Sequence, residues 1–120
     1  VNDTYGHSVG SELLRAVALR LKSAVRETDR AIRYGGDEFV VIMPETPKAG
    51  AVILAGRVRA IIAEPIILGA RPPLIVTASI GVAAYPDDAK DARGLLDAAD
   101  RAMYAAKSAG RNTVRGGPVP

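Results

Sequence analysis

The stretch "RYGGDEFVVIMP", residues 33–44, places two glycines and two carboxylates ahead of a strongly apolar run. Adjacent glycines are a turn signal, and "FVVIM" has the composition of a buried strand. The stretch therefore predicts a β-hairpin with strands at 30–34 and 38–43. Its polar tip has two interpretations, which are a solvated turn or a metal and phosphate site built on Asp37 and Glu38.

The composition describes one small globular domain. The 120 residues are 48% hydrophobic and 24% charged, enough for a single core. The absence of cysteine excludes disulfides and thiolate metal sites and fits a reducing cytoplasm. A net charge of +3 suits a phosphate-bearing ligand, whereas few aromatics and a modest charge argue against a nucleic-acid partner. Since no apolar stretch is long enough to span a bilayer, we expect no direct membrane contact from this segment.

Hydrophobic periodicity predicts the remaining elements. The expected helices are 11–28, a segment that follows Pro47, and 92–108, which Gly110 ends. Strands are expected at 66–68, at 74–83 and in "RNTVR", residues 111–115. Helices that alternate with strands in this way indicate an α/β sandwich.

Six blocks of the sequence resemble one family. "RYGGDEF" is accompanied, in order along the chain, by "ND", "GH", "RETD", "ASIGVA" and "DRAMYAAKSAGRN". Together they span Asn2 to Asn112 and resemble the GGDEF family, the diguanylate cyclase domains. A single such block could arise by chance in a hairpin, but six in the family's order are specific. The resemblance implies an α/β (α+β) sandwich, nucleotidyl-cyclase-like, with a mostly antiparallel central sheet flanked by helices.

The resemblance also implies an activity, the Mg²⁺- or Mn²⁺-dependent condensation of two GTP molecules into cyclic di-GMP. Each domain would bind one GTP, so two domains would act as a homodimer. Asp37 matches the family's metal carboxylate, and Glu38 matches a neighbouring acidic position for metal binding or hydroxyl activation. Gly35 and Gly36 permit positive φ and carry no side chain, so we expect the backbone there to approach a triphosphate closely.

Four further residues match substrate-binding positions of the family. Asn2 matches the residue that reads the guanine edge, although an Asn in a turn or helix cap is the ordinary alternative. Ser11 stands where the family has an aspartate, which predicts guanine binding weaker by about tenfold and a helix N-cap role. Lys107 and Arg111, at i and i+4, match phosphate-binding positions; basic residues also favour helix C-termini without any ligand.

"RETD", Arg26 to Asp29, matches the family's inhibitory product site. An arginine fork can bind a phosphate or a guanine edge, and Asp29 can accept a hydrogen bond from guanine. Arg57 matches an arginine that the family contributes to this site from a neighbouring surface. The alternative is an ordinary ion pair at a helix end.

The resemblance implies a helix and a central strand, with another metal-binding aspartate, ahead of Asn2. We therefore expect residues 1–114 to form the domain without that helix and first strand, and residues 115–120 to form a flexible tail. The chain alone is expected to be inactive. The natural location is expected to be the cytoplasm, as part of a larger sensor protein.

Two other functions are consistent with parts of the sequence. A catalytically inactive member of the family could sense GTP or act as a cyclic di-GMP receptor; Ser11 favours this, and the intact "GGDEF" opposes it. An RNA-binding α/β sandwich has the same class of topology but would need surface aromatics and denser basic charge.

Overall fold

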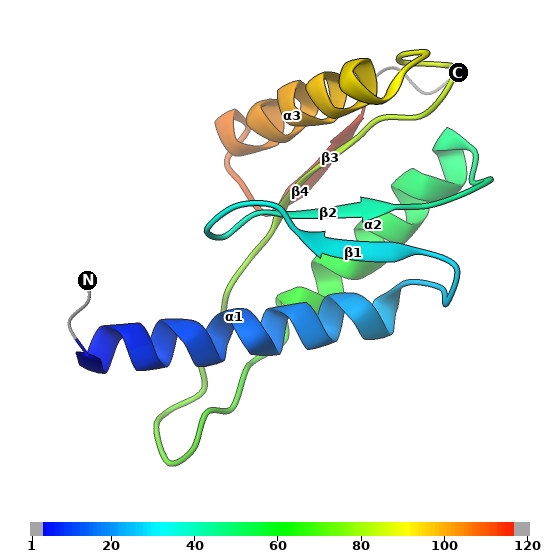
Figure 1. Cartoon of the computed structure of the whole chain (residues 1–120). Coiled ribbons are helices and arrows are strands. Elements are labelled where there is room, and N and C mark those ends of the chain that lie inside the picture. The colour runs from blue at the N-terminus through cyan, green and yellow to red at the C-terminus, as the bar shows by residue number, and fades with distance from the viewer. Residues whose placement is uncertain (1–3, 117–120) are drawn as a thin grey trace.

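The computed structural model describes residues 4–116, with side chains from residue 9 onward. The elements in chain order are α1 (Thr4–Ala24), β1 (Arg30–Arg33), β2 (Phe39–Ile42), α2 (Lys48–Ile62), β3 (Ser79–Val82), α3 (Ala92–Ser108) and β4 (Thr113–Gly116). Figure 1 shows α1 on one side of the hairpin and α3 alongside β3 and β4. The α/β class predicted from the sequence is confirmed.

The strands form two separate pairs. β1 and β2 pair antiparallel, with Arg30 opposite Ile42, whereas β3 and β4 pair parallel, with Ser79 opposite Thr113. Within residues 4–116 no ladder joins the two pairs. Each of the four strands therefore has one edge with no strand beside it in this part of the chain.

The core lies where α1 and α2 pack together under the hairpin. α2 follows Pro47 and buries one helical face; its buried residues are Lys48, Ala51, Ala55, Val58 and Ile62. α1 adds Leu21 and Ala24, against which Phe39 and Val41 of β2 pack. The period-3.6 pattern of the sequence thus identifies the faces that are buried.

α3 packs closely on β3. A Cβ at Gly81 would overlap backbone atoms of Ala99 and Met103, so only glycine lets the strand and the helix approach this closely. The helix begins after Asp91, whose side chain accepts a hydrogen bond from the Gly94 amide at 2.7 Å. This is the N-cap arrangement that satisfies a free amide of the first turn.

Three long side chains tie separate elements together. Arg20 of α1 donates to the carbonyls of Ile61 and Ile62 at 3.1 and 3.3 Å, and to those of Glu64 and Pro65. Ile61 and Ile62 are the last residues of α2, and Glu64 and Pro65 follow it, so Arg20 binds the carbonyls around a helix C-terminus, which lack i+4 partners within the helix. Lys48 pairs with Asp88 at 2.7 Å, and Arg59 reaches Asn112 at 3.0 Å.

The bounds of α1 differ from the prediction. The helix begins at Thr4, so Ser11 lies inside it and the prediction of an N-cap role for Ser11 is wrong. The helix also ends at Ala24 instead of 28, because the chain turns at Arg26–Asp29, where the Asp29 amide donates to the Arg26 carbonyl at 2.9 Å. Asn2 lies outside the described residues.

Some strand bounds differ as well. Of the predicted strand 74–83, only Ser79–Val82 forms a ladder, and it does so with β4 alone. In place of a strand at 66–68 there is a single antiparallel bridge between Ile66 and Leu74. β4 continues to Gly116, two residues into the segment 115–120 that was expected to be a tail.

None of the helices within residues 4–116 combines the length and the apolar character needed to cross a bilayer.

Candidate functional site

The hairpin tip is a turn stabilised by backbone hydrogen bonds and by the Arg33 side chain. The amides of Tyr34 and Gly35 both donate to the Glu38 carbonyl, at 2.8 and 3.3 Å. The Arg33 guanidinium donates to the carbonyls of Gly35 and Gly36, through Nε at 3.2 Å to each and through Nη2 to Gly36 at 2.5 Å. The backbone at the tip is therefore fixed by its own residues.

The two glycines of the tip, Gly35 and Gly36, matter for the space that they leave. Among the described residues only Gly69 and Gly110 are glycines with positive φ, so Gly35 and Gly36 do not use that freedom here. What their lack of a side chain provides is space. A Cβ at Gly36 would meet no atom within 4 Å, and one at Gly35 would lie 3.6 Å from Glu38 Oε1.

The two carboxylates of the tip differ in exposure: Asp37 is exposed, whereas Glu38 is half-buried. Within the part of the chain that the structure describes, no group of three or more His, Cys, Asp or Glu residues is arranged to hold a metal ion. One or two carboxylates with substrate phosphates and water are the usual donors for Mg²⁺. The donor set at the tip therefore fits a hard cation that arrives with a phosphate ligand.

A groove of about 700 Å³ runs between α1 and the hairpin. Ser11 and Arg15 line it from the helix, Arg33 and Phe39 line it from the strands, and Leu14 contributes to its apolar part. An apolar groove with cationic side chains suits a ligand that has a flat base and negative charge. Of the sequence-predicted site residues, Ser11 is the one that lines this groove.

The end of α3 positions Lys107 and Arg111 by a turn. The helix ends at Ser108, and Gly110 then takes φ 108°. The Gly110 amide donates to the Lys107 carbonyl at 3.3 Å and the Arg111 amide to the Ala106 carbonyl at 3.0 Å, the two bonds of a Schellman motif. Arg111 therefore lies beyond the helix, and the i, i+4 spacing does not place it beside Lys107. Lys107 is half-buried and Arg111 is exposed.

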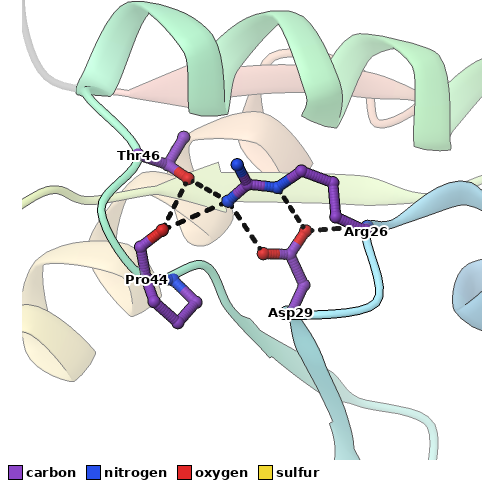
Figure 2. Close-up of polar contacts among 4 residues, drawn as sticks. All are labelled: Arg26, Asp29, Pro44 and Thr46. Carbon is purple, nitrogen blue, oxygen red and sulfur yellow. Dashed lines mark hydrogen bonds and ion pairs between the residues drawn. The ribbon is translucent and has the colours of Figure 1, made fainter.

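Arg26 and Asp29 lie in contact, in the turn after α1 (Figure 2). Arg26 Nη2 is 3.1 Å from Asp29 Oδ1, and the Arg26 amide donates to Asp29 Oδ2 at 2.9 Å. The same guanidinium reaches the segment before α2, where it donates to the Pro44 carbonyl at 3.2 Å and to the Thr46 hydroxyl. The Arg26 side chain is 54% exposed, whereas that of Asp29 is fully buried.

The charges of this pair stabilise each other. The hydrogen bond from the Arg26 side chain holds the pKa of Asp29 below its usual value, against the opposing effect of burial. The same hydrogen bond raises the pKa of Arg26. Asp29 is thus an anion held in place, and Arg26 is a cation with one face toward solvent.

Arg57 lies exposed on α2. Within the described residues, no hydrogen bond or ion pair joins it to Arg26 or Asp29. Of the sequence-predicted residues, then, the structure brings together Arg26 with Asp29, and Gly35 and Gly36 with Glu38. Asp37 lies in the same tip, and Ser11, Arg57, Lys107 and Arg111 lie on other parts of the fold.

Sequence reasoning missed the supporting residues of both turns. Arg33 supports the hairpin tip and Thr46 supports Arg26. The position of Arg33, two residues before a glycine pair, is a weak signal at most. Thr46 is 20 residues from Arg26, so no local pattern connects them.

The family model described as "Diguanylate cyclase, GGDEF domain" matches residues 1–113. Among characterised relatives, the response regulator PleD of Caulobacter vibrioides is 48% identical over 118 residues. The match covers 97% of this chain and 26% of PleD, so the chain spans about a quarter of the length of that relative.

Solved structures share the fold. The GGDEF domain of YfiN from Pseudomonas aeruginosa superposes with a TM-score of 0.86 at 36% identity, over 96% of this chain and 72% of that chain. The GGDEF domain of DgcB from Caulobacter crescentus, solved in complex with c-di-GMP, gives 0.81 at 28% identity, over 96% and 68%.

Proposed function

The chain belongs to the GGDEF family of diguanylate cyclase domains, and on that premise we propose that it condenses two GTP molecules into cyclic di-GMP. The observation that carries the proposal is the hairpin tip. It presents an exposed carboxylate, Asp37, beside a rigid glycine turn that has no side chains to obstruct a phosphate. Such a tip is suited to support phosphoryl chemistry, in which charge stabilisation and positioning supply most of the rate.

In each of two steps a ribose 3′-oxygen forms a bond to the α-phosphorus of the other GTP. The bond between that phosphorus and the bridging oxygen to the β-phosphate breaks, and pyrophosphate leaves. The proton of the 3′-hydroxyl needs an acceptor, and Glu38 is the half-buried carboxylate of the tip that suits this role. Two steps close the ring and release two pyrophosphates.

Asp37, with Glu38 beside it, would hold Mg²⁺ or Mn²⁺. The ion would neutralise phosphate charge when it is bound. The carboxylate oxygens of the hairpin tip, and their exposure, fit such an ion. Lys107 and Arg111 would bind the terminal phosphates, and Ser11, with Asn2, would contact the base.

Because each domain offers one tip, we propose that two copies face each other as a homodimer, so that one GTP on each tip meets the other. A strand from elsewhere in the intact protein is proposed to lie between β2 and β3. The separation of the two strand pairs supports this, since β2 and β3, like β1 and β4, each have an edge without a ladder partner within residues 4–116. Cyclic di-GMP is proposed to bind at Arg26 and Asp29, with Arg57 from another surface, and to inhibit synthesis. We place this activity in the cytoplasm.

The substitution Asp37→Asn tests the metal site in the intact protein. A neutral amide binds Mg²⁺ far more weakly than a carboxylate, so synthesis of cyclic di-GMP from GTP should fall by roughly a hundredfold or more. Asp97→Asn, which removes an exposed carboxylate from α3, is the matched control and should leave the rate unchanged. Near-normal synthesis by Asp37→Asn would remove Asp37 from the metal site.

Ser11 favours a second function, that of a GTP sensor or cyclic di-GMP receptor without catalysis. It lines the groove but offers a shorter, uncharged acceptor in place of the family's aspartate. The substitution Ser11→Asp separates the two functions, because it should tighten GTP binding about tenfold and improve discrimination against ATP. Tighter binding without synthesis would establish the receptor, whereas synthesis by the unaltered protein would exclude it.

A further inference from the structure

The turn that joins α3 to β4 has an unusual backbone. Three consecutive residues have positive φ: Gly110 at 108°, Arg111 at 65° and Asn112 at 48°. Glycine adopts this region freely and asparagine tolerates it, but arginine seldom does. A backbone of this kind persists where surrounding contacts hold it.

Contacts from two elements hold this turn. On the helix side, the Arg111 amide donates to the Ala106 carbonyl at 3.0 Å. From α2, Arg59 Nη1 donates to the side-chain oxygen of Asn112 at 3.0 Å, across 53 positions of sequence. The next residue, Thr113, enters the ladder with β3.

The direction of the Arg111 side chain depends on this backbone. Arg111 is exposed, and the structure shows no hydrogen bond or ion pair for its guanidinium within the described residues. A side chain without contacts of its own is aimed by the φ and ψ of its residue and by the peptide units on either side. One of those units leads to Asn112, which Arg59 holds.

We propose that Arg59 is a positioning residue for phosphate binding, acting through Asn112 to fix the left-handed turn that aims Arg111. The inference rests on the proposed function, in which Arg111 binds a phosphate of GTP. Arg59 is half-buried on α2, and in this proposal it does not contact the ligand itself. The hydrogen bond between Arg59 and Asn112 thus joins α2 to the turn that follows α3.

The test is made on the intact protein, with GTP kinetics and equilibrium binding of a non-hydrolysable GTP analogue measured separately. Arg59→Ala should raise the KM for GTP and the Kd of the analogue by about tenfold, with a much smaller change in kcat. Arg59→Lys should recover part of the loss, because an ammonium can still donate to Asn112. Arg93→Ala, which removes an exposed cation from the first turn of α3, is the control and should change neither constant.

The double variant Arg59→Ala/Arg111→Ala identifies the route of the effect. If Arg59 acts through Arg111, the double variant should bind the analogue no more weakly than Arg111→Ala alone. Losses that add would overturn the inference. Asn112→Gly provides a second path to the same result, since glycine keeps the positive φ but removes the acceptor, and it should weaken binding as Arg59→Ala does.

The outcomes separate this inference from the function on which it rests. If Arg111→Ala leaves the Kd of the analogue unchanged, the proposed phosphate role of Arg111 fails, and the role of Arg59 fails with it. If Arg111→Ala weakens binding but neither Arg59→Ala nor Asn112→Gly does, the inference about Arg59 alone is overturned.

Discussion

Lys48–Asp88 and Arg26–Asp29 are ion pairs of the same chemistry in opposite surroundings. In the first, the charged atoms are 2.7 Å apart and the lysine side chain is 3% exposed, its partner 16%. In the second they are 3.1 Å apart, and the arginine side chain is 54% exposed, its partner 0%. The cation is buried in one pair, and the anion is buried in the other.

This difference in burial separates a structural contact from a candidate binding site. Lys48 is enclosed at the start of α2 and joins it to the turn after β3, where Asp88 also accepts from the Ala84 amide at 2.8 Å. No ligand can reach that ammonium without opening the fold. The Arg26 guanidinium faces solvent while Asp29 stays fixed beneath it, so an anionic ligand can reach the cation.

The largest expected effect is the loss of stability when the enclosed cation is removed. Lys48→Met should lower the free energy of unfolding by about 3 kcal/mol, because it leaves the Asp88 carboxylate partly buried without its partner. Chemical denaturation at pH 7 measures this. Lys90→Met, at an exposed position, is the control and should change stability by less than about 0.5 kcal/mol.

A loss of stability below about 1 kcal/mol for Lys48→Met would break the comparison, since that is the range of a surface pair.

Removing the exposed cation, Arg26, should instead weaken ligand binding. Arg26→Ala is expected to weaken cyclic di-GMP binding by tenfold or more, about the size that losing a charge-assisted hydrogen bond to phosphate gives. Titration calorimetry with cyclic di-GMP measures the affinity. An unchanged affinity would reduce "RETD" to an ion pair in a turn, equivalent to the other pair except for its exposure.

The stabilising contributions of the two paired carboxylates, Asp88 and Asp29, should also depend on pH. Burial acts to raise the pKa of Asp88, but hydrogen bonds from Lys48 and from the Ala84 amide outweigh it, so this pKa is lowered. The pKa of Asp29 is also lowered, because its carboxylate accepts a hydrogen bond from Arg26. A carboxyl with a lowered folded-state pKa stabilises the fold above its unfolded value of about 3.9 and loses that contribution as pH falls through the folded value.

The acid response has a direct measurement in the variant Asp88→Asn. It should be less stable than the unaltered protein at pH 7, and the difference should shrink as pH falls below about 4. Urea denaturation at pH 7, 4 and 3 follows it. A difference that stays constant over this range would mean that the Asp88 charge does not stabilise the fold.

The smallest expected effect concerns the support of Arg26. Thr46→Val removes a hydroxyl that accepts from the guanidinium and keeps the shape of the side chain. Cyclic di-GMP affinity should fall by about threefold, the size of one neutral hydrogen bond. Thr77→Val, at an exposed position away from Arg26 in sequence, is the control. A loss as large as that of Arg26→Ala would mean that Thr46 contacts the ligand itself.

Local signals in the sequence were sufficient for much of the fold. Pro47 and Gly110 mark where α2 starts and where α3 is stopped, because each acts on the backbone next to it. The start of α1 at Thr4 was missed because "TYGHSVG" contains two glycines and little apolar periodicity. The strand at 74–83 was overestimated, since strand composition does not determine how many residues find a partner.

For the candidate site, the sequence suggests residues that could contact a ligand, and these stay predictions. Charged and glycine residues in short motifs carry a chemical signal that can be read from one chain. Thr46 and Arg59 contact residues 20 and 53 positions away, Arg26 and Asn112. Such roles depend on how the elements pack, which no short spacing encodes.

The most direct test of the account is the rate of pyrophosphate release from GTP and Mg²⁺ by the intact protein, measured as cyclic di-GMP is added. We predict that the rate of GTP turnover falls as the cyclic di-GMP concentration rises. In Arg26→Ala the cyclic di-GMP concentration for half-inhibition should increase at least about tenfold. The rate of each protein is compared with its own rate without added cyclic di-GMP. Cyclic di-GMP binding without any turnover of GTP would contradict the account.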